Sequence, residues 1–183
     1  WMSSASVMMA LRKWIMSEFP VSCCGSLSLF DPMARRHPAL IPVAREHHEC
    51  LILAQRLMRG ASGSDPDWPS EPAAQASLLA SFFARHLQQH FATEEQHVFP
   101  AARSAGAQAA ALVAQLLDEH REMTSRIHSL AASPQVAAAD LAAFGEFLNA
   151  HIRLEDRQLF PLMEPQMSAE ALLDLQQRTG DRA

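Results

Sequence analysis

The chain has 183 residues, of which 49% are hydrophobic and 19% are charged, and its formal net charge is −5. This composition is typical of one globular domain with a hydrophobic core of its own. The acidic balance argues against a nucleic-acid or anionic-membrane partner, because no basic surplus exists to neutralise phosphates. No apolar run approaches the roughly 18 residues that a membrane-spanning helix needs. The three cysteines form neither a disulfide framework nor a zinc-type CxxC spacing, so we expect a reducing, cytoplasmic setting.

The first 36 residues differ from the rest of the chain, because they mix Met, Ser and Cys without a lasting period. A secretory signal is disfavoured, since Arg12 and Lys13 follow the short apolar run instead of preceding it. We therefore predict that residues 1–36 form a poorly ordered N-terminal extension, and we interpret Met33 as the natural start. The structured domain is expected over residues 37–183.

From Pro38 onward, apolar residues recur at steps of three and four, as in amphipathic helices. A loop rich in Gly, Ser, Asp and Pro is expected over residues 60–72. Pro100 and Pro161 are expected to stop the second and fourth helices, and Ser133-Pro134 is expected to begin the fourth. The predicted helices cover residues 40–59, 73–99, 107–131 and 134–160, and a short fifth helix covers residues 169–180 after a Ser168 cap.

The links between these helices indicate how they pack. No segment shows the alternation of a β-strand, and the connections at 100–106 and 131–134 are too short for anything but antiparallel neighbours. The sequence therefore predicts an all-α fold, an up-down four-helix bundle with a short C-terminal helix.

One motif occurs in both the second and the fourth predicted helices. His90 precedes Glu94 by four residues, and His151 precedes Glu155 by the same distance. Residues four apart lie on one face of a helix, close enough to bind one metal site. In each helix a proline follows the histidine by ten residues.

The first and third predicted helices also match each other. Glu46-His47 corresponds to Glu119-His120, and each histidine is followed ten residues later by a leucine. The chain is thus a duplicated helix pair, in which each pair supplies a lone histidine and then a His-x-x-x-Glu motif.

Helical periodicity predicts which of these residues face the core. The residues that share a helix face with His47, at spacings of three and four, are apolar or Cys50. The residues that share a face with His48 include Arg45 and Gln55. His48 is therefore predicted at the rim, and Cys50 is interpreted as a packing residue. The same test places six residues inward, namely His47, His90, Glu94, His120, His151 and Glu155.

Two unpaired buried carboxylates would cost several kcal/mol each, and a bound metal removes that cost. Imidazoles and carboxylates together suit iron, zinc or manganese, and two glutamates can bridge a pair of ions. Iron is favoured because the ligand set holds N and O donors without a thiolate. The expected cofactor is a di-iron centre, with zinc or manganese as alternatives.

These motifs resemble those of the hemerythrin-like, or HHE cation-binding, family over roughly residues 37–163. The matching stretches are Arg36 to His48, His90 to Glu95 with Phe99-Pro100, Glu119-His120, and His151 to Glu155 with Phe160-Pro161. The resemblance implies metal ligands at His47, His90, Glu94, His120, His151 and Glu155. It also implies oxo-bridged di-iron chemistry and interaction with oxygen, nitric oxide or peroxide.

The sequence departs from the oxygen-carrying members of that family at two positions. Carriers place a second histidine one turn beyond the third-helix histidine, where this chain has Thr124. They also use an aspartate five residues past the last histidine, which would be Asp156, but the internal repeat with Glu94 favours Glu155. With one histidine fewer, an iron keeps an open or water-filled position, so reversible oxygen carriage is disfavoured.

Two further histidines leave alternatives open. His86 and His97 are either additional metal ligands, donors that orient the ligands, or solvated surface residues. Glu94-x-x-His97 also resembles the Glu-x-x-His motif of ferritin-like bundles, but the matching position in the fourth helix is Gln158.

We predict a non-haem di-iron protein that binds, senses or handles iron or a diatomic gas, and we favour a binding protein over an enzyme. The alternatives are a di-iron enzyme acting on peroxide or nitric oxide, ferritin-like iron oxidation, and a metal-free interaction domain. The expected partners are metal ions and small diatomic ligands; the sequence leaves the oligomeric state open.

Overall fold

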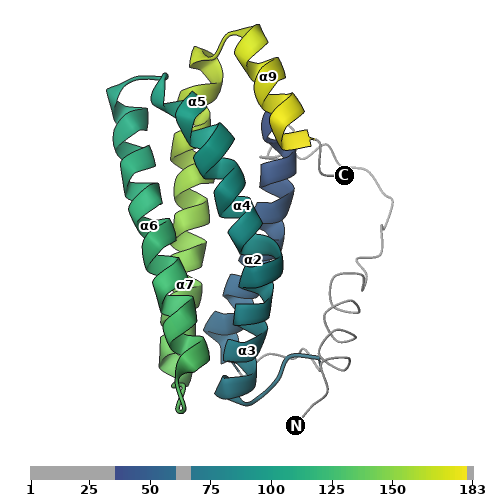
Figure 1. Cartoon of the computed structure of the whole chain (residues 1–183), viewed down its shortest axis with the longest axis vertical. Coiled ribbons are helices and arrows are strands. Elements are labelled where there is room, and N and C mark those ends of the chain that lie inside the picture. The colour runs from purple at the N-terminus through teal and green to yellow at the C-terminus, as the bar shows by residue number, and fades with distance from the viewer. Residues whose placement is uncertain (1–35, 61–66, 181–183) are drawn as a thin grey trace, which may run out of the picture.

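The computed structural model describes residues 36–60 and 67–180, and within these ranges every regular element is helical (Figure 1). The predicted all-α fold is confirmed. Met33 and the predicted extension lie outside the described residues, apart from Arg36. In the part of the chain that the structure describes, no helix combines the length and the apolar character needed to cross a membrane.

Four long helical segments pack as an up-down bundle, and a fifth helix packs beside the start of the first (Figure 1). Two of the long segments are continuous helices that contain π-helical turns, labelled η3, η4 and η5; η1 and η6 are 3-10 turns. The described elements are η1 (Pro38–Leu40), α2 (Ile41–Arg59), α3 (Pro72–Phe82), η3 (Phe83–Leu87), α4 (Gln88–Thr93), η4 (Glu94–Val98), α5 (Phe99–Arg103), α6 (Ala107–Ala132), α7 (Ala138–Leu154), η5 (Glu155–Leu159), α8 (Phe160–Met163), η6 (Glu164–Gln166) and α9 (Ala169–Gly180).

The fourth helix begins later than predicted, at Ala138 instead of Pro134. The Ser133 hydroxyl donates to the Gln135 carbonyl oxygen at 2.6 Å and accepts from the Gln135 N–H at 3.3 Å. Serine side chains often close such local turns in competition with helix capping. The predicted Ser168 cap of the last helix is present, because the Ala171 N–H donates to the Ser168 hydroxyl at 3.1 Å.

The two prolines expected to stop helices do not stop them. Pro100 lies in the first turn of α5 and Pro161 in the first turn of α8, and the helices continue to Arg103 and Met163. Each proline is the second residue after a π turn, where the backbone hydrogen-bond pattern already changes. A missing N–H is tolerated in the first turn of a helical segment.

The buried apolar residues form two clusters, one toward each end of the bundle. Along α2 the chain passes from the cluster around Val43, through His47, to the cluster around Leu53. Along the next long segment the order is reversed, from Phe91 through Glu94 to Val98, and it reverses again in each later segment. The alternation is that of an up-down bundle, and it leaves a polar layer of histidine and glutamate between two apolar layers.

Two further contacts shape the bundle. Gly145 of α7 lies so close to α2 that a Cβ there would sit 2.6 Å from the Ala54 carbonyl oxygen. Helix α9 is attached to η1, because the Thr179 hydroxyl donates to the Ala39 carbonyl oxygen at 2.8 Å. Leu175 of α9 is buried against the same end of the bundle.

Candidate metal centre

The structure brings all six predicted residues together in the polar layer, each from a different turn of the four long segments. Every one of them is buried, with 0–3% of its surface exposed. The lone histidines come from α2 and α6, the paired histidines from α4 and α7, and the glutamates from the first positions of η4 and η5. The set is His47, His90, Glu94, His120, His151 and Glu155.

Their donor atoms form two groups that share both glutamates. His47 and His90 form one group with Glu94 and Glu155, and His120 and His151 form the other with the same two carboxylates. Within each group the donor atoms lie within 4.8 Å of one another. The internal repeat relates one group to the other, and each group has the donor types and the spacing that could hold a metal ion.

The inner nitrogen of each ring points into this layer. His47 Nε2 lies 3.2 Å from Glu94 Oε1 and 3.1 Å from Glu155 Oε2. His120 Nε2 lies 3.1 Å from His151 Nε2. Four buried atoms of the set have no hydrogen-bond partner, namely His90 Nε2, Glu94 Oε2 and both Glu155 carboxylate oxygens. Buried acceptors of this kind are costly unless a cation binds them, so the residues present fit a metal centre.

A π turn begins at each of the two glutamates. The first, η4, starts at Glu94, four residues after His90, and η5 starts at Glu155, four residues after His151. In a π turn the backbone hydrogen bonds join residues five apart instead of four, and such turns occur often at functional sites. The repeat in the sequence therefore extends to an unusual backbone feature at both carboxylates.

Each histidine also has a carboxylate on its outer nitrogen. His47 Nδ1 lies 2.9 Å from Asp156, and the other three Nδ1 atoms lie 2.7–2.9 Å from Glu46, Glu95 and Glu119. An ionised carboxylate only accepts, so each Nδ1–H donates outward and each Nε2 is the ring nitrogen that faces the interior. This arrangement fixes the tautomer and the ring orientation of metal-binding histidines.

A family model described as the hemerythrin HHE cation binding domain matches residues 42–163. The chain belongs to the hemerythrin HHE cation-binding domain family. The matched range contains both donor groups, and helix α9 follows it. Searches of curated proteins and of solved structures found no match to this chain.

The outer carboxylates were missed in the sequence, although a signal for them was present in this hemerythrin-family chain. Glu46 and Glu119 each precede a lone histidine, and Glu95 and Asp156 each follow a glutamate of the set. The repeat thus places an acidic residue beside a donor four times. Asp156, weighed as an alternative to Glu155, binds His47 Nδ1 and belongs to neither donor group.

The charges in this layer stabilise one another. Burial alone would lower the pKa of His47, but the carboxylates of Asp156, Glu155 and Glu94 outweigh it, and that pKa lies well above its ordinary value. Burial alone would raise the pKa of Glu94, but the imidazoles of His90, His120 and His47 hold it well below its ordinary value. The centre therefore holds ionised carboxylates, the form that binds a cation.

Three other side chains that the sequence singled out lie elsewhere. His48 is exposed, as its helical face predicted. His86 and His97 are partly exposed and belong to neither donor group, and the His86 ring packs 4.9 Å from the Phe82 ring. Cys50 is buried in the apolar cluster beside the centre, and burial raises the pKa of its thiol well above the ordinary value.

Proposed function

We propose that this chain is a non-haem di-iron protein of the hemerythrin family. One iron would be held by His47 and His90, the other by His120 and His151, with Glu94 and Glu155 bridging them. The observation that carries the proposal is the pair of fully buried carboxylates shared by two histidine groups, three of whose oxygen atoms accept no hydrogen bond. Zinc and manganese accept the same donors, but a set of N and O donors without a thiolate favours iron.

The protein's own contribution is to hold the ions and to control access to them. The outer carboxylates orient the imidazoles, and the two apolar clusters keep bulk water from both ends of the layer. Bound iron would supply redox chemistry and an open position for a diatomic ligand. We therefore infer that the chain binds, senses or handles iron or a diatomic gas.

A di-iron enzyme acting on peroxide or nitric oxide is the second candidate. It is favoured by Thr124, which stands one turn beyond His120 where oxygen carriers have a histidine, because an uncoordinated position lets a substrate reach the metal. Ferritin-like iron oxidation has less support, since His97 belongs to neither donor group and the fourth segment has Gln158 at the matching position.

Metal analysis of the purified protein tests the centre itself. We expect two irons per chain, and we expect His90→Ala and Glu155→Ala to lower that number because each removes a donor. His48→Ala is the matched control, because His48 lies beside His47 on the same helix and is exposed. If both donor variants keep two irons per chain, the assignment is wrong.

Stopped-flow spectra of the reduced protein separate the two functions. Mixing with oxygen, nitric oxide or peroxide should give a stable adduct if the protein binds or senses the ligand. Continuous consumption of peroxide or nitric oxide over many equivalents would instead support the enzyme.

A further inference from the structure

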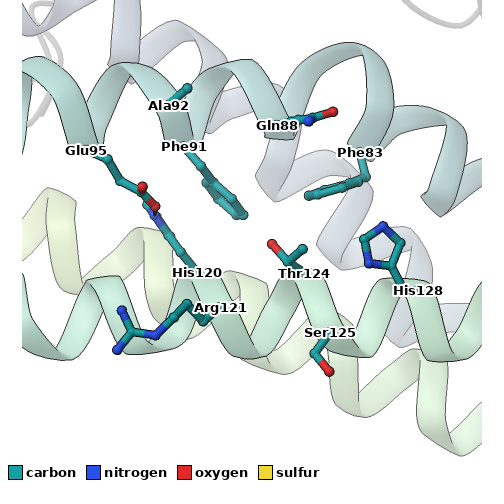
Figure 2. A pocket seen from close by; sticks show the side chains of 10 residues that line it. All are labelled: Phe83, Gln88, Phe91, Ala92, Glu95, His120, Arg121, Thr124, Ser125 and His128. Carbon is teal, nitrogen blue, oxygen red and sulfur yellow. Dashed lines mark hydrogen bonds and ion pairs between the residues drawn. The ribbon is translucent and has the colours of Figure 1, made fainter.

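A pocket of about 560 Å³ opens between α4 and α6 (Figure 2). Phe83, Gln88 and Phe91 line it from the second long segment, and Thr124 and His128 line it from α6. Its volume lies within the range of roughly 300–1,000 Å³ that is typical of small-molecule sites. Of the six residues of the candidate metal centre, His120 alone belongs to its lining.

The pocket reaches the candidate metal centre through one donor residue. His120 and its outer partner Glu95 both belong to the lining. The Phe91 ring is stacked on the His120 ring, with centroids 3.8 Å apart and planes 16° apart. Figure 2 shows Phe91 and Thr124 pointing into the space between the two helices. Phe91 therefore stands between the pocket and the polar layer.

The face that corresponds to the pocket by the internal repeat is packed differently. The face that corresponds to it lies between α2 and α7, where Leu51 takes the place of Thr124 and Ile152 takes the place of Phe91. There Gly145 lets the two backbones approach closely, and Leu51 and Ile152 join the apolar cluster. Apolar side chains thus fill the α2–α7 face beside its histidines, whereas the α4–α6 face has a pocket beside His120.

A backbone feature also distinguishes the open face. The π turn η3 spans Phe83–Leu87, directly before the pocket residue Gln88, and Phe83 itself lines the pocket. The corresponding part of the fourth segment is regular helix, since α7 runs unbroken from Ala138 to Leu154. An extra π turn costs regular hydrogen bonds, and such turns occur often at functional sites.

We propose that this pocket admits a small monoanion of azide or nitrite size to the metal held by His120 and His151, with the Phe91 ring as the gate. This inference rests on the proposed di-iron function. Thr124 points its side chain into the space between the helices, and Gln88 and Arg121, which carry N–H donors, lie at its edge, where Arg121 also pairs with Asp118. The acidic residue of the lining, Glu95, already accepts the His120 Nδ1–H. An acceptor-rich anion matches this set of donors.

Azide binding to the iron-loaded, oxidised protein tests the proposal, with the charge-transfer absorption of iron-bound azide as the readout. Thr124→Phe fills the pocket, and we expect it to slow azide association about tenfold or more, because binding that must wait for a conformational change is slower. Phe91→Leu removes the ring but keeps a buried apolar side chain, so the fold should survive. We expect it to speed association.

Leu51→Phe and Ile152→Val are the matched controls, because they make similar changes on the corresponding face. We expect both to leave the association rate within about twofold, since that face is closed. Iron content is measured first for every variant. Equal rate changes in the control pair, or unchanged rates in Thr124→Phe and Phe91→Leu, overturn the pocket assignment alone. A wild-type chain that holds no iron overturns both the pocket assignment and the proposed function.

Discussion

The α2–α7 face and the α4–α6 face of the bundle are built from corresponding residues, yet they differ in how tightly they are closed. Gly145 allows α7 to pack against α2 at a distance that a Cβ would not permit. The corresponding position in the other helix pair is Ala84, which is exposed. The α4–α6 face holds a pocket where the α2–α7 face holds packed apolar side chains.

The outer carboxylates on these two faces differ in the same way. Asp156, on the α2–α7 face, is 15% exposed and pairs with Arg36 at 2.8 Å as well as with His47. Glu95, its counterpart on the α4–α6 face, is 43% exposed. A duplicated set of donors can therefore be held firmly on one face while the other face is left for access. On our proposal, the α2–α7 face serves to hold the metals and the α4–α6 face to admit a ligand.

The largest effect is expected from the residues that both donor groups share. Glu94→Ala removes a donor from each group, whereas His90→Ala removes a donor from one. We expect Glu94→Ala to lose nearly all bound iron and the rise in melting temperature that metal binding gives. Metal analysis and thermal unfolding with and without added iron check this. Equal iron contents in the two variants would show that the carboxylate does not bridge.

The outer carboxylates should come next. Asp156→Asn removes the charged acceptor of His47, and we expect a loss of about 10–100-fold in metal affinity. Glu95→Gln should lie at the lower end of that range, because solvent already screens the more exposed carboxylate. Competition with a chelator measures both affinities. Asp118→Asn is the control, since Asp118 is exposed and pairs with Arg121; a similar loss there would point to net charge as the cause.

A smaller effect on folding is expected from Gly145→Ala. The new Cβ would meet the Ala54 carbonyl oxygen and the Leu57 side chain, so α2 and α7 must separate. Overpacking outweighs the gain in helix propensity, and we expect unfolding free energy to fall by about 1–2 kcal/mol. Urea denaturation measures the change. Ala84→Ser on the exposed counterpart should stay within about 0.5 kcal/mol of wild type, and a larger loss there would contradict the contrast between the faces.

Much of this architecture follows from the sequence. The 3.6-residue period identified the inward face of each helix, and it separated buried His47 from exposed His48. Spacing of four residues, repeated in two helices, was enough to expect His90 with Glu94 and His151 with Glu155 on common faces. These features are local to one helix, which is why periodicity finds them.

What the sequence did not reveal depends on contacts between helices or on fine backbone geometry. Glu46 lies on the flank of α2, and its partner His90 is 44 residues away on another helix. The π turns leave no periodic signature, so the continuation of the helices past Pro100 and Pro161 was not expected. Thr124 suggested an open metal position, but only the packing of α4 against α6 decides whether there is space beside it.

The smallest effect is expected from Thr124→Val, which keeps the shape of the side chain and removes its hydroxyl. Because Thr124→Val leaves all six imidazole and carboxylate donors in place, iron content should stay at the wild-type value. The binding free energy of azide should weaken only by the net contribution of one hydrogen bond, about 0.5–1.5 kcal/mol. Titration of the absorption of iron-bound azide measures this change. Thr124→His should act differently, because an imidazole one turn beyond His120 competes with azide for the metal. If Thr124→Val instead loses iron, the hydroxyl holds the metal itself, and the α4–α6 face is part of the ligand shell instead of a route to it.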